Sequence, residues 1–194
     1  MLFPTDNDFD IPTLLLDRQS VGVVTPVIAW GTVSRGVSMP GTWVFYVDDS
    51  RFTALIRDPL QLVRTSCKSA VEPNITLFEH SPKAEVIWAT YRKRLVARQW
   101  QEHGIEIRVD LNVPARHRDL CMLGVPAGWS AFATRGYAAR LAELAEELGF
   151  AQSWGGPGAT TLVYGGGLKV EALCRSTPGA VYVPSHMASI QGTA

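Results

Sequence analysis

Short apolar segments typical of β-strands alternate with amphipathic segments typical of helices along nearly the whole chain, and this alternation constrains the fold most strongly. Parallel neighbouring strands cannot be joined by tight turns and need crossover connections, which are usually helices. The sequence therefore predicts an α/β fold with a mainly parallel sheet and alternating helices. About six or seven strands are expected, which is compatible with either a layered sandwich or an incomplete barrel.

Three segments have the clearest local patterns. Ser81-Pro82-x-x-Glu85 is typical of a helix start, and the helix is expected to continue to His103. Residues 105–113 alternate apolar and polar side chains, which predicts a half-buried strand with Asp110 on its solvated face. Residues 137–148 form an amphipathic helical pattern that is expected to end at Gly149. Its inward positions are expected to be Leu141, Leu144, Ala145 and Leu148.

The remaining elements follow from weaker patterns of the same kinds. The other expected strands are 21–30, 43–47, 70–76, 129–134, 160–164 and 180–183, and the other expected helices are 50–66, interrupted near Pro59, and 115–123. Residues 31–41 are rich in glycine and are expected to form a loop. Pro26 cannot donate a backbone hydrogen bond, so it is expected at a strand end or a sheet edge.

The chain is long enough for one domain with a substantial core. A chain of 194 residues can bury about 70% of its unfolded surface. Residues 1–20 are expected to wrap the domain edge, residues 21–184 to form a single α/β domain, and residues 185–194 to be a C-terminal tail. Ser185 to Ser189 resembles a cloning-vector sequence, so the tail is not expected to be part of the folded domain.

Charge and cysteine content exclude several classes of protein. Eighteen basic and eighteen acidic residues give zero formal charge, which excludes bulk electrostatic coating of nucleic acid and requires any anion site to be local. The three cysteines lack Cys-x-x-Cys spacing, so buried thiols are favoured over a disulfide framework or a four-cysteine zinc site. No signal peptide or membrane span is expected, and a cytoplasmic location is predicted.

Polar side chains follow two of the expected strands. Asp48 and Asp49 come directly after residues 43–47, and Glu72 and Asn74 lie in or after the next strand. Ligands of parallel α/β folds bind at the carboxyl ends of strands. Carboxylates there could bind Mg²⁺ or transfer protons, so Asp48, Asp49 and Glu72 are candidate catalytic residues, and the two aspartates are candidate metal ligands. The alternative interpretation of Asp49 is a helix N-cap.

The helix expected after Ser81 carries a polar stripe at helical spacing. Its members are Tyr91, Arg94, Arg98 and Gln101. Arginine can bind phosphate with two parallel hydrogen bonds, so the stripe is a candidate site for DNA or a phosphorylated ligand, with Tyr91 as a candidate nucleophile and Asn74 as a further ligand contact. The alternative is a solvated basic face with internal ion pairs. Trp88 and Trp100 of the same helix are expected in the core.

Several short segments together resemble the family known as domain of unknown function 4417. These are Trp43 to Phe52, Tyr91 to Arg94, Arg98 to Gln101 with Gly104-Ile105, Leu123 to Gly128, and Thr134 to Gly136. The resemblance covers roughly residues 20–170 and implies a phage or plasmid setting without an established activity. The chain departs from the family pattern at Glu72-Pro73-Asn74 and between Asp110 and Asn112, which argues against a shared metal-dependent chemistry.

These features define two main functional hypotheses. The first is a phage- or plasmid-type protein that acts on DNA or a phosphorylated ligand, with Mg²⁺ as the candidate cofactor. The second is a non-catalytic module that binds DNA or a host protein. A third hypothesis, a base-recognising barrel enzyme, rests on Gly166-Gly167-Leu168 near Val170, which resembles a loop of tRNA-guanine transglycosylases. The sequence alone does not decide between an enzyme and a binding module.

Overall fold

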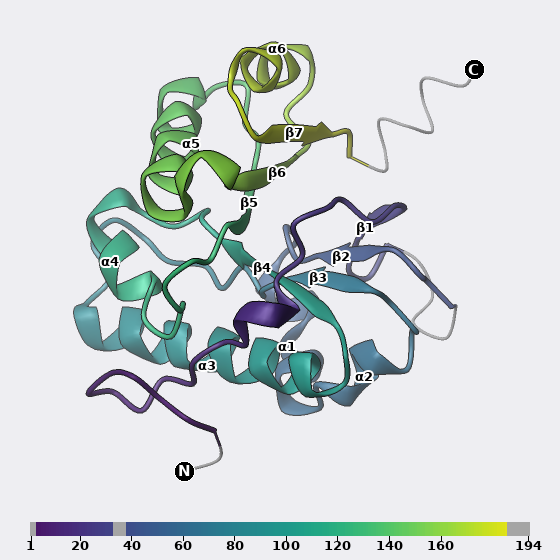
Figure 1. Ribbon diagram of the computed structural model, residues 1–194, viewed down its shortest axis with the longest axis vertical. Helices are drawn as coiled ribbons and strands as arrows, with labels where there is room; N and C mark the ends of the chain where they lie inside the picture. Colours follow the sequence, from purple (N-terminus) through teal and green to yellow (C-terminus); the bar gives the residue numbers. More distant parts are fainter. Residues whose placement is uncertain (1–2, 33–37, 186–194) are drawn as a thin grey trace.

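The computed structural model describes residues 3–32 and 38–185 (Figure 1). The strands are β1 (Val27–Ala29), β2 (Thr42–Val44), β3 (Ser69–Val71), β4 (Glu106–Asp110), β5 (Ala131–Arg135), β6 (Thr160–Tyr164) and β7 (Ala180–Val183). The α-helices are α1 (Thr53–Arg57), α2 (Leu60–Val63), α3 (Lys83–Glu102), α4 (Arg118–Cys121), α5 (Leu141–Gly155) and α6 (Leu168–Ser176). Residues 33–37 of the expected loop and residues 186–194 of the expected tail lie outside the described residues.

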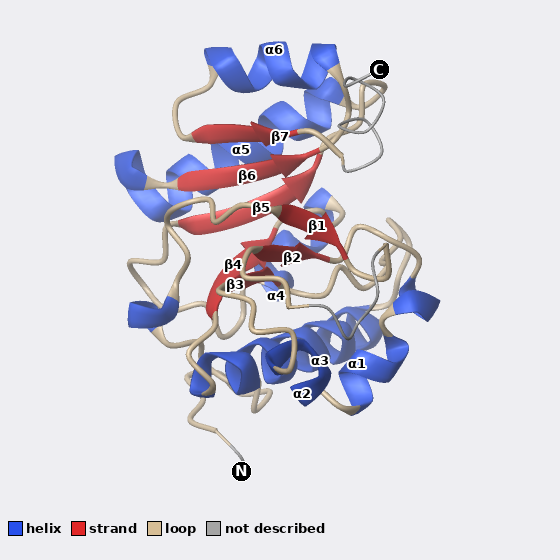
Figure 2. Cartoon of the chain, turned by 90° about the vertical axis from the view of Figure 1, so that its right-hand side faces the viewer, coloured by secondary structure: helices blue, strands red, loops and turns tan. Residues whose placement is uncertain are grey.

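The strands form one parallel sheet in chain order, from β1 to β7, which curves into an open half-barrel. This confirms the α/β class and, of the two expected architectures, the incomplete barrel. Because every crossover moves one strand further in the same direction and such crossovers are right-handed, the helices gather on one side of the sheet. Figures 1 and 2 show α1–α3 beside β1–β4, and α5 and α6 beside β5–β7.

Two hydrophobic clusters cover the two faces of the sheet. On the helix side, Trp43, Phe45 and Ile107 pack with Val96 and Trp100 of α3. On the inner side, a second cluster joins β1, β2, β3, β5 and β6. The buried residues of this cluster are Val27, Ala29, Val44, Tyr46, Val71, Ala133, Leu162 and Tyr164. Alternate residues of a strand point to opposite faces, so both sides of the half-barrel are packed.

Strand β4 is buried on both faces, and the prediction of a half-buried strand was wrong. Arg108 and Asp110 are each 1% exposed. The N-terminal segment crosses the inner face, where the Arg108 guanidinium donates to the carbonyls of Val21 and Gly22 at 3.0 and 2.8 Å. Period-two alternation cannot reveal this cover, because the covering segment is remote in sequence.

Other element predictions need correction, and the strands expected over 43–47 and 70–76 end earlier, at Val44 and Val71. Strand β1 is shorter than 21–30 and begins after Pro26, which supplies no ladder donor. Helix α5 continues past Gly149 to Gly155, and it exposes Ala145 while burying Glu147. Helix α6 was not expected at all. The kinked helix 50–66 is realised as separate short helices on either side of Pro59, in agreement with the sequence.

Candidate functional site

The carboxyl ends of β2, β3 and β4 bring together a set of hydrogen-bonded side chains that we call the buried polar cluster. Its members are Tyr46, Glu72, Asn74, Lys93, Arg94, Asp110 and Asn112. Lys93 and Arg94 come from α3, whereas the other members follow or end strands. The cluster therefore lies at the edge of the sheet where parallel α/β folds bind ligands.

The charges inside this cluster neutralise one another. The Arg94 guanidinium forms an ion pair with Glu72, and both side chains are completely buried. The Lys93 ammonium lies 3.8 Å from a Glu72 oxygen and 4.0 Å from an Asp110 oxygen. Arg94 Nε also donates to the carbonyl of Leu123 at 2.9 Å. Two carboxylates thus face two cations, the arrangement that buried charges require.

Asp110 is the centre of the hydrogen bonds that connect the strand ends. It accepts from the Tyr46 hydroxyl at 3.2 Å and from the Asn74 amide at 2.9 Å, and the backbone N–H of Asn112 donates to it at 3.2 Å. Burial, reinforced by the negative charge of Asp110, raises the pKa of Tyr46 well above its usual value. The Tyr46 ring stacks on that of Tyr164, with centroids 6.1 Å apart. Tyr46 therefore acts as a neutral hydrogen-bond donor.

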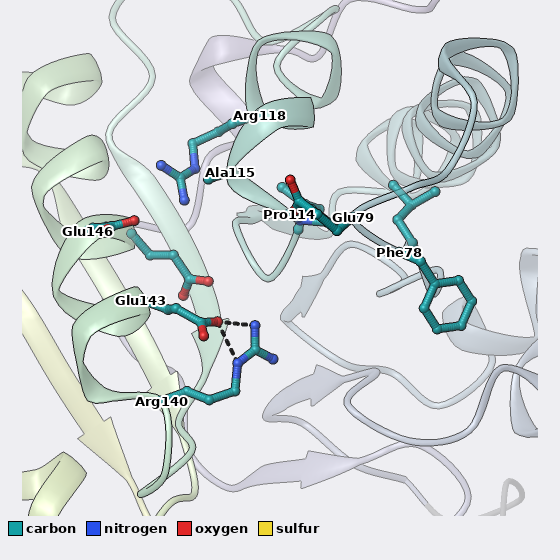
Figure 3. Close-up of a pocket in the computed structure, with 11 residues that line it drawn as sticks. Phe78, Glu79, Pro114, Ala115, Arg118, Arg140, Glu143 and Glu146 are labelled. Atoms are coloured by element: carbon teal, nitrogen blue, oxygen red, sulfur yellow. Dashed lines mark hydrogen bonds and ion pairs between the residues drawn. The ribbon is translucent and has the colours of Figure 1, made fainter.

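A cleft adjoins this cluster on the side of α5. Its main hollow has a volume of about 410 Å³, and a neighbouring hollow of about 280 Å³ shares Phe78, Pro114 and Arg140 with it. Figure 3 shows side chains from the segment before α3, from the start of α4 and from α5 facing one another across this space. The charged lining residues of the main hollow are Glu79, Arg118, Arg140, Glu143, Glu146 and Glu147. The volume is in the range of small-ligand sites.

Glu147 differs from the other acids of the cleft because its side chain is only 6% exposed. It accepts a 2.5 Å hydrogen bond from the Thr134 hydroxyl of β5. Burial raises the pKa of Glu147 to about 7, the negative charge of Asp110 adds to this, and the Thr134 hydrogen bond, Arg118 and Arg140 act in the opposite direction. Glu147 can therefore change its protonation near neutral pH.

Two arginines reach the cleft and differ in their partners. Arg140 is paired with Glu143, and Figure 3 draws this interaction. The Arg118 guanidinium lies over the ring of Phe150 at 5.1 Å from its centroid, and its Nε is buried without a hydrogen-bond partner in the described part of the chain. Among the residues that the structure describes, no carboxylate lies within 4.0 Å of Arg118. Arg118 is thus a cation with hydrogen-bonding capacity directed into the cleft (Figure 3).

The two aspartates predicted as metal ligands lie beside this region, and no third acid joins them among the described residues. Asp48 is exposed, whereas Asp49 accepts from the backbone N–H of Thr76 at 3.1 Å and from its hydroxyl at 2.9 Å. The capping alternative for Asp49 is not realised, since Asp49 begins η2 (Asp49–Arg51) and no side chain caps that helix. In residues 3–32 and 38–185, no group of three or more potential metal-ligating side chains occurs. Mg²⁺ at these aspartates stays a prediction.

The stripe on α3 is real, but most of it faces the protein interior. Arg94 pairs with Glu72, Arg98 pairs with Glu102 and lies over the Phe3 ring at 4.8 Å, and Gln101 exchanges hydrogen bonds with the backbone of Leu15. The alternative of a solvated basic face was wrong, because these three side chains are buried. Arg94 and Gln101 have their donors occupied, whereas Nε of Arg98 is buried without a hydrogen-bond partner among the described residues. The predicted anion contacts of the stripe stay a prediction.

The aromatic residues of α3 divide between the core and the surface. Trp100 is fully buried, as expected, but Trp88 is 59% exposed. Trp88 stacks on the partly buried Tyr91 with ring centroids 5.6 Å apart. Together with Phe9, Ala84 and Ile87, they line an apolar hollow of about 450 Å³, which we call the aromatic patch. The three cysteines are buried and free, which confirms the expectation of buried thiols.

Sequence reasoning missed the charged residues of the cleft. Glu147 lies on the helix predicted over 137–148, between apolar positions that face the sheet. An acid on the inward side of an amphipathic helix was the signal that could have identified it. Arg118 had no comparable signal, because its position depends on how the segment 112–118 packs against α5.

Fold and cleft together define a parallel half-barrel α/β protein with a polar cleft at the carboxyl edge of its sheet. The profile of the domain of unknown function DUF4417 matches residues 3–148, and the chain belongs to this family. The chain is similar to two phage proteins, each called Gene 1 protein. The protein of Mycobacterium phage D29 is 28% identical over 134 residues, which cover 66% of this chain and 48% of the relative.

The second relative, from Mycobacterium phage L5, is 27% identical over 139 residues, which cover 66% of this chain and 57% of the relative. The chain therefore spans about half the length of the curated relatives it matches. No solved structure matches the chain. Within the described part of the chain, no helix has both the length and the apolar character needed to cross a membrane.

Proposed function

We propose that this relative of phage proteins binds a phosphorylated ligand of nucleotide size in the cleft at the carboxyl edge of its sheet. The observation that carries the proposal is Arg118, a cation that lines the cleft with no carboxylate within 4.0 Å among the described residues. A guanidinium with free donors is suited to phosphate oxygens. The hollow of about 410 Å³ has room for one nucleotide rather than for a duplex.

The charge balance of the cleft narrows the ligand further. Its main hollow is lined by four glutamates and two arginines, and one of the arginines is already paired with Glu143. A run of phosphodiesters would be repelled by this lining, whereas one phosphate next to Arg118 is compatible with it. Of the predicted ligands, DNA or a phosphorylated ligand, the cleft therefore favours a mononucleotide or a single nucleotide unit of a strand.

The test is calorimetric titration of the protein with AMP, GMP, CMP, UMP and ribose 5-phosphate, with and without Mg²⁺. At least one nucleotide is expected to bind, and Arg118→Ala is expected to weaken that binding by about tenfold to a hundredfold, the value of a hydrogen bond to a charged group. Arg175→Ala is the control, because Arg175 is 77% exposed on α6 and pairs with Glu171. Absence of binding, or equal effects of the two variants, would contradict the proposal.

The aromatic patch supports a second candidate function, a non-catalytic module that binds single-stranded DNA. Exposed aromatic rings can stack on bases regardless of sequence, and Trp88 with Tyr91 offers such a stacked pair. The test is quenching of tryptophan fluorescence by oligothymidylate. Trp88→Ala is expected to abolish the quenching, whereas Trp154→Ala, which alters a 40% exposed tryptophan on α5, is expected to preserve it. Quenching that survives Trp88→Ala would exclude this surface.

A further inference from the structure

We infer that the carboxylate of Glu147 accepts N–H groups from the base of the bound ligand, so that the cleft selects an amino-bearing nucleobase. This inference rests on the proposed nucleotide site and adds the class of base that the site takes. It starts from the position of Glu147, which lines both the main hollow and a smaller one next to Asn112 and Arg135.

The wall around Glu147 is rich in acceptors. Glu143 and Glu146 follow the same helix into the cleft, as Figure 3 shows. Ionised carboxylates can only accept hydrogen bonds. Glu143 is already paired with Arg140, so a ligand that offered only acceptors on this side would leave Glu147 with the Thr134 hydroxyl as its donor, whereas amino and ring N–H groups would satisfy it. Arg118 lies on α4, across the cleft, where it would hold the phosphate (Figure 3).

Thr134 orients the Glu147 carboxylate toward this role. Its hydroxyl donates to Glu147 Oε2 at 2.5 Å from the sheet side. That hydrogen bond fixes one oxygen against β5, while the side chain as a whole still lines the cleft. The titratable and charged groups that act on Glu147 come from every element around it. Those that act on its charge are Tyr46 after β2, Asp110 of β4, Arg118 of α4 and Arg140 before α5. Those that line the same hollows are Arg135 of β5, Tyr137, and Glu143 and Glu146 of α5 itself.

Because Glu147 must be ionised to accept two N–H groups side by side, the affinity for the ligand should depend on pH. Burial raises the pKa of Glu147 to about 7, so the free protein carries a proton there in mildly acidic solution. A base that offers two N–H groups side by side, as guanine does through N1 and N2, is matched by the ionised carboxylate, whose oxygens only accept, and its binding therefore releases that proton to the solvent. Affinity is expected to be constant above the pKa and to fall by about tenfold for each pH unit below it.

The first arm of the experiment compares nucleotides that differ by one amino group. AMP is titrated against purine riboside 5′-monophosphate, and GMP against IMP, from about pH 5.5 to about pH 8.5. The phosphate is common to each pair, so its own ionisation near pH 6 cancels in the comparison. At least one amino-bearing member is expected to bind about tenfold more tightly than its partner at the alkaline end. This preference is expected to shrink as the pH falls.

Glu147→Gln keeps the size of the side chain and removes its charge. The variant is expected to lose both the amino preference and its pH dependence, while Glu143→Gln is expected to keep the pH dependence. If wild-type protein binds nucleotides without an amino preference, or if Glu147→Gln retains that preference, the inference is overturned and the nucleotide site stands. If no nucleotide binds to the wild type, the proposed function itself fails and the inference fails with it.

The second arm observes the carboxyl group directly. The ¹³C carboxyl resonance of Glu147, assigned by its disappearance in Glu147→Gln, is followed against pH with and without AMP or GMP. The midpoint is expected at about 7 in the free protein and is expected to fall in the complex. Thr134→Val is expected to raise the midpoint, because it removes a donor to the ionised form, whereas Thr134→Ser is expected to preserve it. A midpoint near the ordinary value, or one that rises on binding, would overturn the inference.

Discussion

The buried polar cluster and the cleft lie side by side at the carboxyl edge of the sheet, but they treat charge in opposite ways. In the cluster, Glu72 and Asp110 face Lys93 and Arg94, and every one of these side chains is nearly inaccessible. In the cleft, Glu147 is almost as deeply buried, and among the described residues only a hydroxyl is bonded to its carboxylate. Arg118, nearby, has no carboxylate within 4.0 Å among the described residues.

The comparison separates charges that hold the fold together from charges that are available to a ligand. A buried ion needs a counter-charge or a full set of hydrogen bonds. Where the protein supplies them, as for Arg94, the side chain has little left to offer a ligand. Where the protein supplies them incompletely, as for Glu147 and Arg118, the ligand can complete them, which is why we place the site in the cleft.

The largest effect is expected from unbalancing the cluster. Glu72→Gln leaves Arg94 and Lys93 without their shared carboxylate, and we expect the free energy of unfolding to fall by about 3–5 kcal/mol. Urea denaturation followed by circular dichroism measures this change. Asp58→Asn is the control, because it removes an exposed ion pair with Arg64 and should cost less than about 1 kcal/mol. Equal losses in the two variants would remove the distinction between the regions.

The next largest effect is expected at Glu147, where the same kind of substitution should stabilise the protein instead of destabilising it. Because the pKa of Glu147 is raised to about 7 in the folded protein, the folded state holds a proton that the unfolded state has already lost in mildly acidic solution. Stability should therefore decrease as the pH rises from about 4.5 to about 7 and stay level above that. Glu147→Gln removes this decrease and should stabilise the protein at about pH 8, by at most about 3 kcal/mol.

Denaturation of the wild type and Glu147→Gln at acidic and alkaline pH checks this prediction. The two proteins should differ least below about pH 4.5, where Glu147 is protonated in both states. If Glu147→Gln destabilised the protein at every pH, Glu147 would be a satisfied structural group like Glu72, and the contrast with the cluster would be lost.

Removing Arg118 should affect stability much less than removing Glu72. Arg118→Ala loses the contact with the Phe150 ring, and the expected cost is about 0.5–1 kcal/mol. The same change should raise the pKa of Glu147 further, since Arg118 favours its ionised form. Thermal denaturation and the ¹³C titration of Glu147 measure these two effects. A loss of several kcal/mol would assign Arg118 to the fold rather than to the ligand site.

The smallest effect is expected at the exposed pair beside the cleft. Arg140 and Glu143 are each about half exposed and form an ion pair three residues apart. Arg140→Gln should change the free energy of unfolding by less than about 0.5 kcal/mol, because exposed pairs are screened by solvent. Denaturant titration at low and moderate salt checks this. A larger, salt-independent loss would show that the cleft wall is held by its ion pairs.

The local patterns of the sequence were sufficient for the fold class and for several elements. Ser81-Pro82 and Gly104 correctly predicted where helix α3 begins and ends. Short runs that contain β-branched residues correctly predicted β2 and β6. The glycine at position 149 was misleading, because α5 pays only a modest helix-propensity penalty there and continues through packing of Leu148 and Ala151. Tertiary contacts decided that boundary.

The candidate site was less accessible to sequence reasoning, for a physical reason. Glu72 and Asn74 were noticed because they follow a strand, and they do lie in the buried polar cluster. Whether a charged side chain is paired depends on remote elements, as Arg94 shows with partners after β3 and α4. The same dependence concealed Glu147, whose partner Thr134 lies on another element.

The most direct test of the account is a map of AMP or GMP binding by ¹⁵N chemical shifts. We expect the amide shifts to change most around Thr134, Arg118 and Glu147, with α6 unaffected. The same titration of Arg118→Ala should produce much smaller changes at equal ligand concentration. Shifts confined to the aromatic patch around Trp88, or a complete absence of shifts in the wild type, would contradict the claim that the incompletely matched charges of the cleft form the ligand site.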